Sequence, residues 1–143
     1  MENEDVMCDG EIELSDRAKS LWGKTNRVDD TEWLPLYVHM ADSAAMAARI
    51  WDTWVPYGTK SIISRDLGND DDLARKLMIF LAGVHDIGKA TPVFQAKPIS
   101  FGPDAESLVW KPEQAGLPMI AGLRDTSHPT HPIAGQVILE RYF

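Results

Sequence analysis

Histidine and aspartate stand side by side at His85 and Asp86, within the segment GVHDIGKATPVFQ that covers residues 83–95. Both side chains ligate metal ions, and imidazole together with carboxylate suits Mn, Fe, Co, Ni or Zn more than Mg alone. A bound ion polarises a phosphate oxygen and lowers the pKa of a bound water, which phosphodiester hydrolysis requires. The same doublet has a simpler interpretation, in which Asp86 orients His85 or pairs with Lys89 three residues further on.

The other histidines, His39, His128 and His131, decide how far the metal interpretation extends. His39 and His85 follow apolar residues by three or four positions, so both are expected on the inner faces of helices. An isolated inward histidine is usually structural and bonded to a backbone carbonyl. His131 opens the last helical segment and could supply a third imidazole. His128, in the segment SHPTHP, is its rival, although a loop position suits it better.

Helices must position these side chains. Apolar residues at steps of three and four predict a helix over residues 34–55, beginning near Pro35 and ended by Pro56 and Gly58. A second helix is predicted over residues 69–89, with an N-cap at its start and Gly88 as C-cap. The inner stripe of the first helix is Leu36, Met40, Ala44, Ala47, Trp51 and Trp54. The inner stripe of the second helix is Leu73, Leu77, Phe80, Leu81 and Val84.

The remaining segments are shorter or less regular. No strand is indicated, and the fold class is predicted to be all-α. Residues 57–70 read as a connection with at most a helical turn. Short helices are expected within residues 15–24, capped by Ser15 or Asp16, within 91–97, and over 131–143, while 99–116 read as a long excursion.

Composition sets the class of protein. The 143 residues suit one domain, with an acidic tail expected to be disordered over residues 1–15 and a helical domain over 16–143. The net charge of −8 argues against nucleic-acid binding without a partner, because phosphate contacts need clustered Lys and Arg. Cys8 is the single cysteine, and no secretory signal or membrane-spanning run is present, so a cytoplasmic protein is expected.

The pattern of histidines resembles the HD superfamily of metal-dependent phosphohydrolases. LWGKT, WLPLYVHMADSAAMAARIWD and FLAGVHDIGKATPVFQAK resemble, more narrowly, the N-terminal HD nuclease domain of the type I CRISPR-associated nuclease-helicase. The resemblance covers residues 20–97 well and 128–143 more loosely. It implies a compact all-α HD-domain bundle with one or two divalent ions, from among Mn, Fe, Co, Ni and Mg. It also implies antiviral cleavage of single-stranded DNA, fed in by a helicase portion after recruitment to a guide-RNA effector complex, with no membrane involved.

Carried over by position, the resemblance implies that His39, His85, Asp86 and His131 bind metal. It also implies catalytic roles for Asp86, which bridges the ions in two-metal members, and for Lys89, near the phosphate. His128 remains the rival of His131. The chain departs from the family because no histidine follows His131 and the helicase portion is absent. We therefore expect a domain truncated at its C-terminus, whose uncovered apolar surface needs a partner or self-association.

Two other functions compete with the nuclease. One is an HD phosphohydrolase that acts on nucleotides or cyclic dinucleotides, and the other is an inactive, truncated HD fragment that serves as a binding module. The segments LWGKT and GKATPVFQ favour the nuclease, while the missing ligands favour the binding module. Within the second segment, Phe94 and Gln95 could line a substrate groove, although a core position suits Phe94 better, as it does Trp51 and Trp54.

Overall fold

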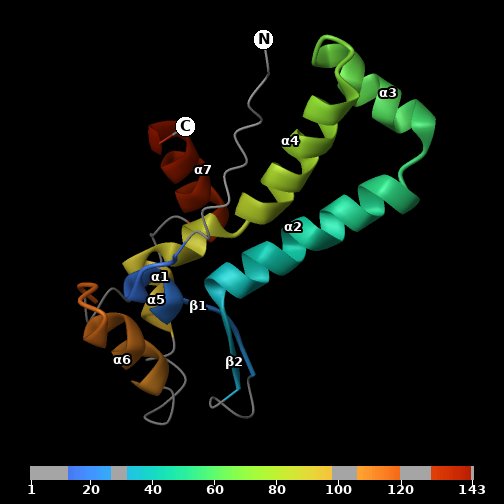
Figure 1. The fold of residues 1–143 in the computed structure, drawn as a ribbon. Helices are drawn as coiled ribbons and strands as arrows, with labels where there is room; N and C mark the ends of the chain where they lie inside the picture. The colour runs from blue at the N-terminus through green and yellow to red at the C-terminus, as the bar shows by residue number, and fades with distance from the viewer. Residues whose placement is uncertain (1–12, 27–31, 98–105, 120–129, 143) are drawn as a thin grey trace, which may run out of the picture.

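The structure of the chain, a computed structural model, describes residues 13–26, 32–97, 106–119 and 130–142. Helices dominate it, as the sequence predicts, and the two longest, α2 and α4, pack side by side (Figure 1). In chain order the elements are α1 (Asp16–Ser20), β1 (Trp22–Thr25), β2 (Trp33–Pro35), α2 (Leu36–Thr53), α3 (Tyr57–Asp66), α4 (Asp71–Val84), the 3₁₀ helix η1 (Ile87–Ala90), α5 (Pro92–Gln95), α6 (Glu106–Gln114) and α7 (His131–Tyr142).

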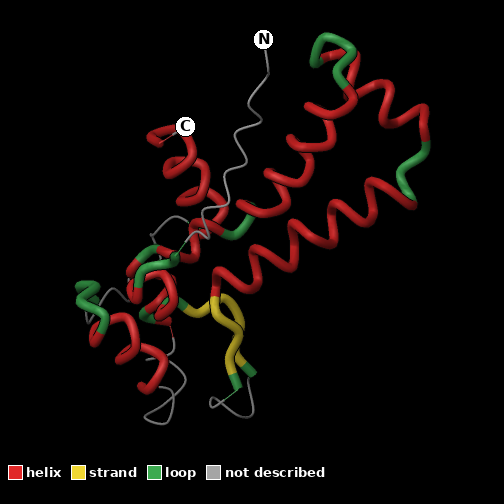
Figure 2. The backbone as a smooth tube through the Cα atoms, viewed as in Figure 1, coloured by secondary structure: helices red, strands yellow, loops and turns green. Residues whose placement is uncertain are grey.

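Helices α2, α3 and α4 form an arm that projects from the rest of the chain (Figures 1 and 2). α2 and α4 approach closely because small residues meet between them: a Cβ atom added to Gly83 would lie 3.4 Å from the Cβ of Ala44. Farther along the arm, Arg75 donates two hydrogen bonds of 2.8 Å to the Asp52 carboxylate. The arm therefore holds the end of α4 beside the start of α2, where His39 lies.

Both long helices begin close to their predicted starts. Pro35 is the N-cap of α2, where its missing N–H costs nothing. Asp70 caps α4 by accepting a hydrogen bond of 2.9 Å from the Leu73 N–H. The predicted end of α4 is wrong, because the helix stops at Val84 and the chain continues into η1, which contains Gly88.

Residues 57–70, predicted to be a connection, contain the ten-residue helix α3. Pro56 and Gly58 follow the end of α2 at Thr53, in agreement with their predicted role in ending that helix. They also begin the next helix, since Pro56 is the N-cap of α3 and Gly58 lies in its first turn. Proline at a helix start fixes a favourable φ and loses no hydrogen bond, so the same residue stops one helix and starts the next. The predicted excursion over 99–116 likewise contains α6.

A small antiparallel sheet stands at the base of the arm, although the sequence indicated no strand (Figure 2). β1 and β2 pair Trp22 with Pro35 and Thr25 with Trp33, with a register shift between Trp22 and Lys24. Strands this short are set by packing rather than by propensity. Gly23 lets β1 lie close to the first turn of α2, because a Cβ atom on Gly23 would lie 3.1 Å from the Leu36 Cα atom.

The buried aromatic core lies at the base and not along the arm. Trp22, Phe94 and Leu108 form it, and Trp33 packs against it. The rings of Trp22 and Phe94 are 4.6 Å apart between centroids. The core position predicted for Phe94 is thus confirmed, and β1, α5 and α6 meet at this cluster.

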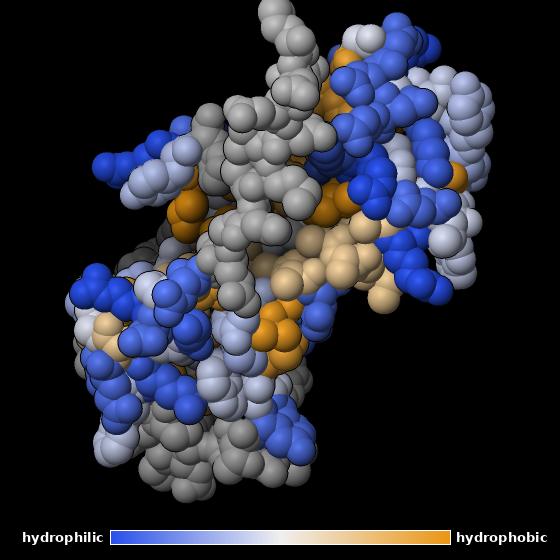
Figure 3. Space-filling view, viewed as in Figure 1, coloured by the Kyte–Doolittle hydropathy of each residue, from blue (hydrophilic) through white to orange (hydrophobic). Residues whose placement is uncertain are grey.

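The apolar stripes of the arm are only partly buried. Trp51 is buried as predicted, but the prediction for Trp54 is wrong, since it is 83% exposed. On α4, Leu73, Phe80 and Leu81 are each more than one-third exposed. Figure 3 shows hydrophobic residues on the face of the arm that is turned toward the viewer. The contact between α2 and α4 therefore leaves these residues partly open to solvent.

The chain before the sheet follows the prediction where it is described. α1 begins after Ser15, whose hydroxyl accepts a hydrogen bond of 3.3 Å from the Ala18 N–H, so Ser15 rather than Asp16 is the cap. Most of the predicted acidic tail, residues 1–12, lies outside the described residues. In the part of the chain that is described, no helix has the length and apolar character needed to cross a bilayer.

Candidate metal centre

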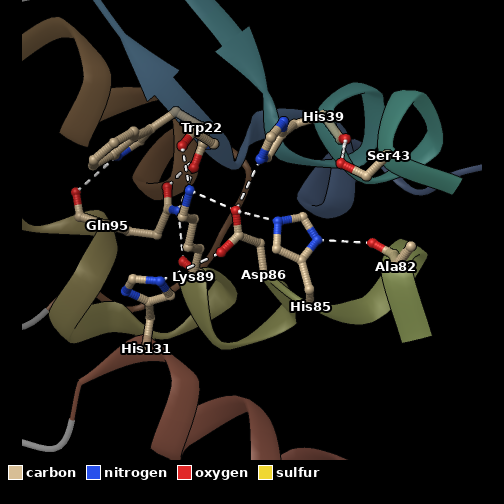
Figure 4. Close-up of polar contacts among 10 residues, drawn as sticks. Trp22, His39, Ser43, Ala82, His85, Asp86, Lys89, Gln95 and His131 are labelled. Atoms are coloured by element: carbon tan, nitrogen blue, oxygen red, sulfur yellow. Dashed lines mark hydrogen bonds and ion pairs between the residues drawn. The ribbon is translucent and has the colours of Figure 1, made fainter. Parts of the chain in front are cut away.

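Four elements bring polar side chains to one point at the base of the arm (Figure 4). α2 contributes His39 from its first turn, and His85 and Asp86 follow the last residue of α4. Lys89 comes from η1, and His131 is the first residue of α7. The structure thus brings together all five residues named from the sequence, four of them around the carboxylate of the fifth, Asp86. The rival, His128, lies outside the described residues.

Asp86 is the centre of this cluster. Its Oδ2 atom lies 2.8 Å from His39 Nε2, 3.1 Å from His85 Nε2 and 2.7 Å from Lys89 Nζ. Its Oδ1 atom lies 3.4 Å from His131 Nε2. Asp86 and His39 are buried, whereas the side chain of His85 is 45% exposed, so the predicted inward position of His85 is wrong. The cluster is therefore closed around the carboxylate and reaches solvent at His85.

The surroundings of Asp86 keep it ionised. Burial alone would raise the pKa of this carboxyl, because it disfavours the charged form. Hydrogen bonds from Lys89 and His39, with the positive charges of Lys89 and His85, outweigh burial and hold the pKa of Asp86 below its ordinary value. A carboxylate ionised at neutral pH is the form that binds a cation.

His85 is held in one tautomer by its own helix. Its Nδ1 lies 2.7 Å from the Ala82 carbonyl oxygen, and because a carbonyl only accepts, Nδ1 carries the proton. In the neutral ring Nε2 then carries a lone pair, and it faces Asp86 Oδ2. Two electron-rich atoms facing each other need a proton or a metal cation beside them. Such a hydrogen bond on the far ring nitrogen is the usual support of a metal-binding histidine.

These residues fit a divalent metal ion. His39, His85 and Asp86 each offer one ligand atom, and the three atoms lie within 4.8 Å of one another. His39 Nε2 donates to the carboxylate in the metal-free arrangement and would release this proton to become a ligand. Two imidazoles and one carboxylate form a donor set that suits Mn, Fe, Co or Ni better than Mg.

The imidazole of His131 lies at the edge of the cluster. Its ring meets the Phe94 ring edge-on, with centroids 5.5 Å apart. Partial burial lowers the pKa of His131, and nearby positive charges add to this effect against the attraction of Asp86. The ring is therefore biased toward its neutral form, which can ligate a metal.

The position of His131 depends on a close backbone contact that sequence analysis missed. A Cβ atom added to Gly88 would lie 1.8 Å from the His131 carbonyl oxygen and 2.5 Å from the Gly135 nitrogen. From the other side, a Cβ atom on Gly135 would lie 3.4 Å from the Gly88 nitrogen. A side chain at Gly88 is excluded, and this glycine lets the first turns of α7 rest directly on η1.

Lys89 is buried, at 9% exposed, and its ammonium lies 5.5 Å from the centroid of the Phe94 ring, between two polar partners. Its ammonium donates to Asp86 and, at 3.0 Å, to the Gly23 carbonyl oxygen of β1. The pairing of Lys89 with Asp86 considered from the sequence is present. Gly23 was missed, because it acts through its main chain, which residue type does not reveal.

The sequence analysis also missed the role of Gln95, which bonds to the main chain of Lys89. Gln95 was considered for a substrate groove, but it is 1% exposed and cannot line one. Its carboxamide instead bonds to the main chain of Trp22 and to the carbonyl oxygen of Lys89. The only available signal was its place in the GKATPVFQ segment, which had no assigned geometry.

Two known proteins are similar to this chain in sequence. Over 126 residues it is 36% identical to "CRISPR-associated nuclease/helicase Cas3" of Streptococcus thermophilus, which covers 83% of this chain and 14% of that protein. Over 85 residues it is 34% identical to "CRISPR-associated endonuclease/helicase Cas3" of Thermus thermophilus, covering 59% of this chain and 9% of that protein. The chain thus spans a small part of these relatives. No solved structure matches it.

The family comparison covers nearly the whole helical region. The family model "Cas3, HD domain" matches residues 22–143, which begin at β1 and include every element from there to α7. The matched region contains the His-Asp doublet, His39 and His131, the residues gathered around Asp86. The chain therefore belongs to the Cas3 HD domain family.

Proposed function

We propose that this chain is a metal-dependent nuclease domain that hydrolyses phosphodiester bonds of single-stranded DNA in CRISPR interference. The observation that carries the proposal is the convergence of His39, His85 and Asp86 in a chain of the Cas3 HD domain family. One or two divalent ions serve the reaction, with Mn, Fe, Co and Ni preferred over Mg by the donor set. A bound ion supplies Lewis-acid polarisation of the phosphate and an acidified water.

The protein's own groups have separate tasks in this proposal. His39, His85 and the Asp86 carboxylate hold the ion, and His131 adds an imidazole from the side of Asp86 Oδ1. The hydrogen bond to Ala82 keeps His85 Nε2 free to ligate. Lys89 balances negative charge beside Asp86, which limits repulsion when an anionic phosphate approaches.

The DNA is proposed to reach the site through partners. Both relatives carry "helicase" in their names, and the chain spans only a small share of each. A helicase portion that delivers a single strand, recruited by a guide-RNA effector complex, explains how a chain of net charge −8 acts on a polyanion. The acidic chain then needs no extended basic surface of its own.

The test compares Asp86→Ala with Asp42→Asn, which removes the charge of an exposed aspartate of α2. Metal-free protein is supplied in turn with Mn²⁺, Co²⁺, Ni²⁺ or Mg²⁺, and cleavage of labelled single-stranded DNA is measured beside hydrolysis of nucleotides and cyclic dinucleotides. We expect metal-dependent DNA cleavage by the wild type and Asp42→Asn, and at least a 100-fold loss in Asp86→Ala, on the order of removing a principal catalytic group.

Three results would contradict the proposal. Hydrolysis of nucleotides without cleavage of DNA would identify a nucleotide phosphohydrolase. Stoichiometric metal binding without any hydrolysis would identify a binding module. Equal cleavage by Asp86→Ala, with circular dichroism matching the wild type, would place the activity outside this centre.

A further inference from the structure

The Gln95 side chain lies behind the metal centre and is almost fully buried. We infer that Gln95 is a positioning residue: its carboxamide ties β1 to the turn after Asp86 and so holds the Lys89 ammonium on the Asp86 carboxylate. The inference deepens the proposed function and rests on it where metal binding is concerned. Its contacts, however, belong to the protein alone and can be tested without metal.

The carboxamide of Gln95 uses both its donor and its acceptor ends (Figure 4). Oε1 accepts from the Trp22 N–H at 3.1 Å, and Nε2 donates to the Trp22 carbonyl oxygen at 2.9 Å. Nε2 also donates to the Lys89 carbonyl oxygen at 2.8 Å. The Trp22 indole closes the frame by donating to the Gln95 carbonyl oxygen at 3.2 Å. One side chain therefore bonds to both main-chain groups of a strand residue and to η1.

These bonds fix both ends of Lys89 to the same stretch of β1. Gln95 joins the Lys89 carbonyl to Trp22, and the ammonium of Lys89 bonds to the next residue, Gly23. β1 therefore restrains the Lys89 side chain in the conformation that places its ammonium on Asp86, three residues earlier in the same turn. β1 also packs against His39, one of the proposed metal ligands, since a Cβ atom on Gly23 would lie 3.3 Å from the His39 Cβ.

Other residues cannot easily replace this connection. If Gln95 loses its amide, the Trp22 N–H, the Trp22 carbonyl and the Lys89 carbonyl lose these partners in a buried place, which is costly for polar groups. β1 and η1 would then separate to recover hydrogen bonds to water. Because Gln95 is 1% exposed, its effect on the centre passes through Lys89 and β1 rather than through direct contact with a substrate.

The first experiment measures Co²⁺ affinity from the absorption of the bound ion, at a temperature where every variant is folded. Gln95→Met keeps the volume and removes the hydrogen bonds, and Gln114→Met makes the same change at an exposed glutamine of α6. Trp51→Phe loosens buried packing near the far end of α2 and controls for general destabilisation. We expect the dissociation constant to rise about 10–100-fold in Gln95→Met, the range for outer-shell partners of metal ligands, and to stay unchanged in both controls.

Two results would overturn the inference. In one, folded Gln95→Met binds Co²⁺ with wild-type affinity and spectrum. In the other, Trp51→Phe, at equal loss of stability, weakens Co²⁺ binding as much as Gln95→Met. If Gln95→Met does not fold, Gln95→Glu replaces it, because it keeps an acceptor for the Trp22 N–H but cannot donate to Lys89; the same loss of affinity is expected.

The second experiment uses metal-free protein and follows the Lys89 ammonium by ¹H–¹⁵N NMR. A buried, hydrogen-bonded ammonium exchanges slowly, so its signal is expected in the wild type and Gln114→Met and is lost in Gln95→Met. A retained signal in Gln95→Met contradicts the inference whether or not the wild type binds metal. Conversely, a wild type that binds Co²⁺ but cleaves no DNA contradicts the proposed function and leaves the role of Gln95 standing.

Discussion

Asp86 concentrates the electrostatics of the site in one residue. Its two oxygens face three imidazoles and one ammonium, and it is only 6% exposed. A buried carboxylate with this many partners is stable only because they compensate for lost hydration. Removing it leaves Lys89 as an uncompensated buried cation. The central residue of the candidate metal centre is thus also a structural residue.

This double role predicts a pH-dependent loss of stability in Asp86→Asn. Since the pKa of Asp86 is lower in the folded than in the unfolded chain, the unfolded chain takes up the proton first as pH falls. The stabilisation is complete above the unfolded value, near 3.8, and is lost as pH falls through the folded value. We expect Asp86→Asn to lower the free energy of unfolding by about 3 kcal/mol at pH 7, as for a broken buried ion pair.

Urea denaturation at pH 7 and near pH 3 measures this difference, with Asp42→Asn as the control for a change at an exposed carboxylate. The gap between wild type and Asp86→Asn should narrow at the lower pH. A gap that stays the same at both values would show that the Asp86 charge does not contribute to stability.

At the level of the elements, α7 is attached to the site by its backbone. Its first turns rest on Gly88, where no Cβ fits, while Ile133 and Val137 remain more than half exposed. The place of His131 therefore depends on a residue in another element. A change at Gly88 is expected to displace α7 and His131 together, without touching His39 or His85.

Gly88→Ala tests this dependence. An added methyl group would clash with the His131 carbonyl oxygen and the Gly135 nitrogen, so α7 must move away. We predict weaker Co²⁺ binding, by about 10-fold as for other disturbances of a metal shell, and faster amide exchange confined to α7. Gly58→Ala is the matched control, since a Cβ atom there has nothing within 4 Å. Unchanged exchange in α7 would contradict the backbone contact.

The sequence predicted the features that depend on a long apolar pattern or on the chemistry of particular side chains. The two long helices and the group His39, His85 and Asp86 were accessible, because apolar spacing and ligand chemistry are visible in residue types. β1 and β2 were not, because strands this short carry too little pattern and depend on packing, here that of Trp22 against Phe94 and Leu108. α3 was missed because Pro56 can end a helix as well as begin one. Gln95 was misplaced because its role depends on which main chains lie beside it.

For the whole molecule, the candidate metal centre joins the arm to the base. His39 and the doublet belong to the ends of α2 and α4, whereas Lys89 and His131 follow in η1 and α7. The aromatic core lies on the base side, and the arm buries few of its large apolar residues. An ion that binds all these elements stabilises the folded chain far more than the unfolded one, where no site exists.

Metal binding is therefore expected to raise thermal stability. A ligand at 100 times its dissociation constant contributes about 2.7 kcal/mol to the folded state. We predict a clear increase in Tm on saturation of the wild type with Co²⁺, its reversal by a chelator, and no increase in Asp86→Ala. Differential scanning calorimetry measures all three. Equal shifts in wild type and Asp86→Ala would show that the ion binds elsewhere.

The acceptor that Gly23 offers to Lys89 is a main-chain carbonyl oxygen, which no point mutation can delete. In evolutionary terms, a substitution at residue 23 changes the side chain but leaves the carbonyl acceptor of this contact in the chain. Selection must then act on Lys89 and on whatever keeps the strand in place. Substitutions that disable the candidate centre should therefore also be found at positions outside it that determine where β1 lies.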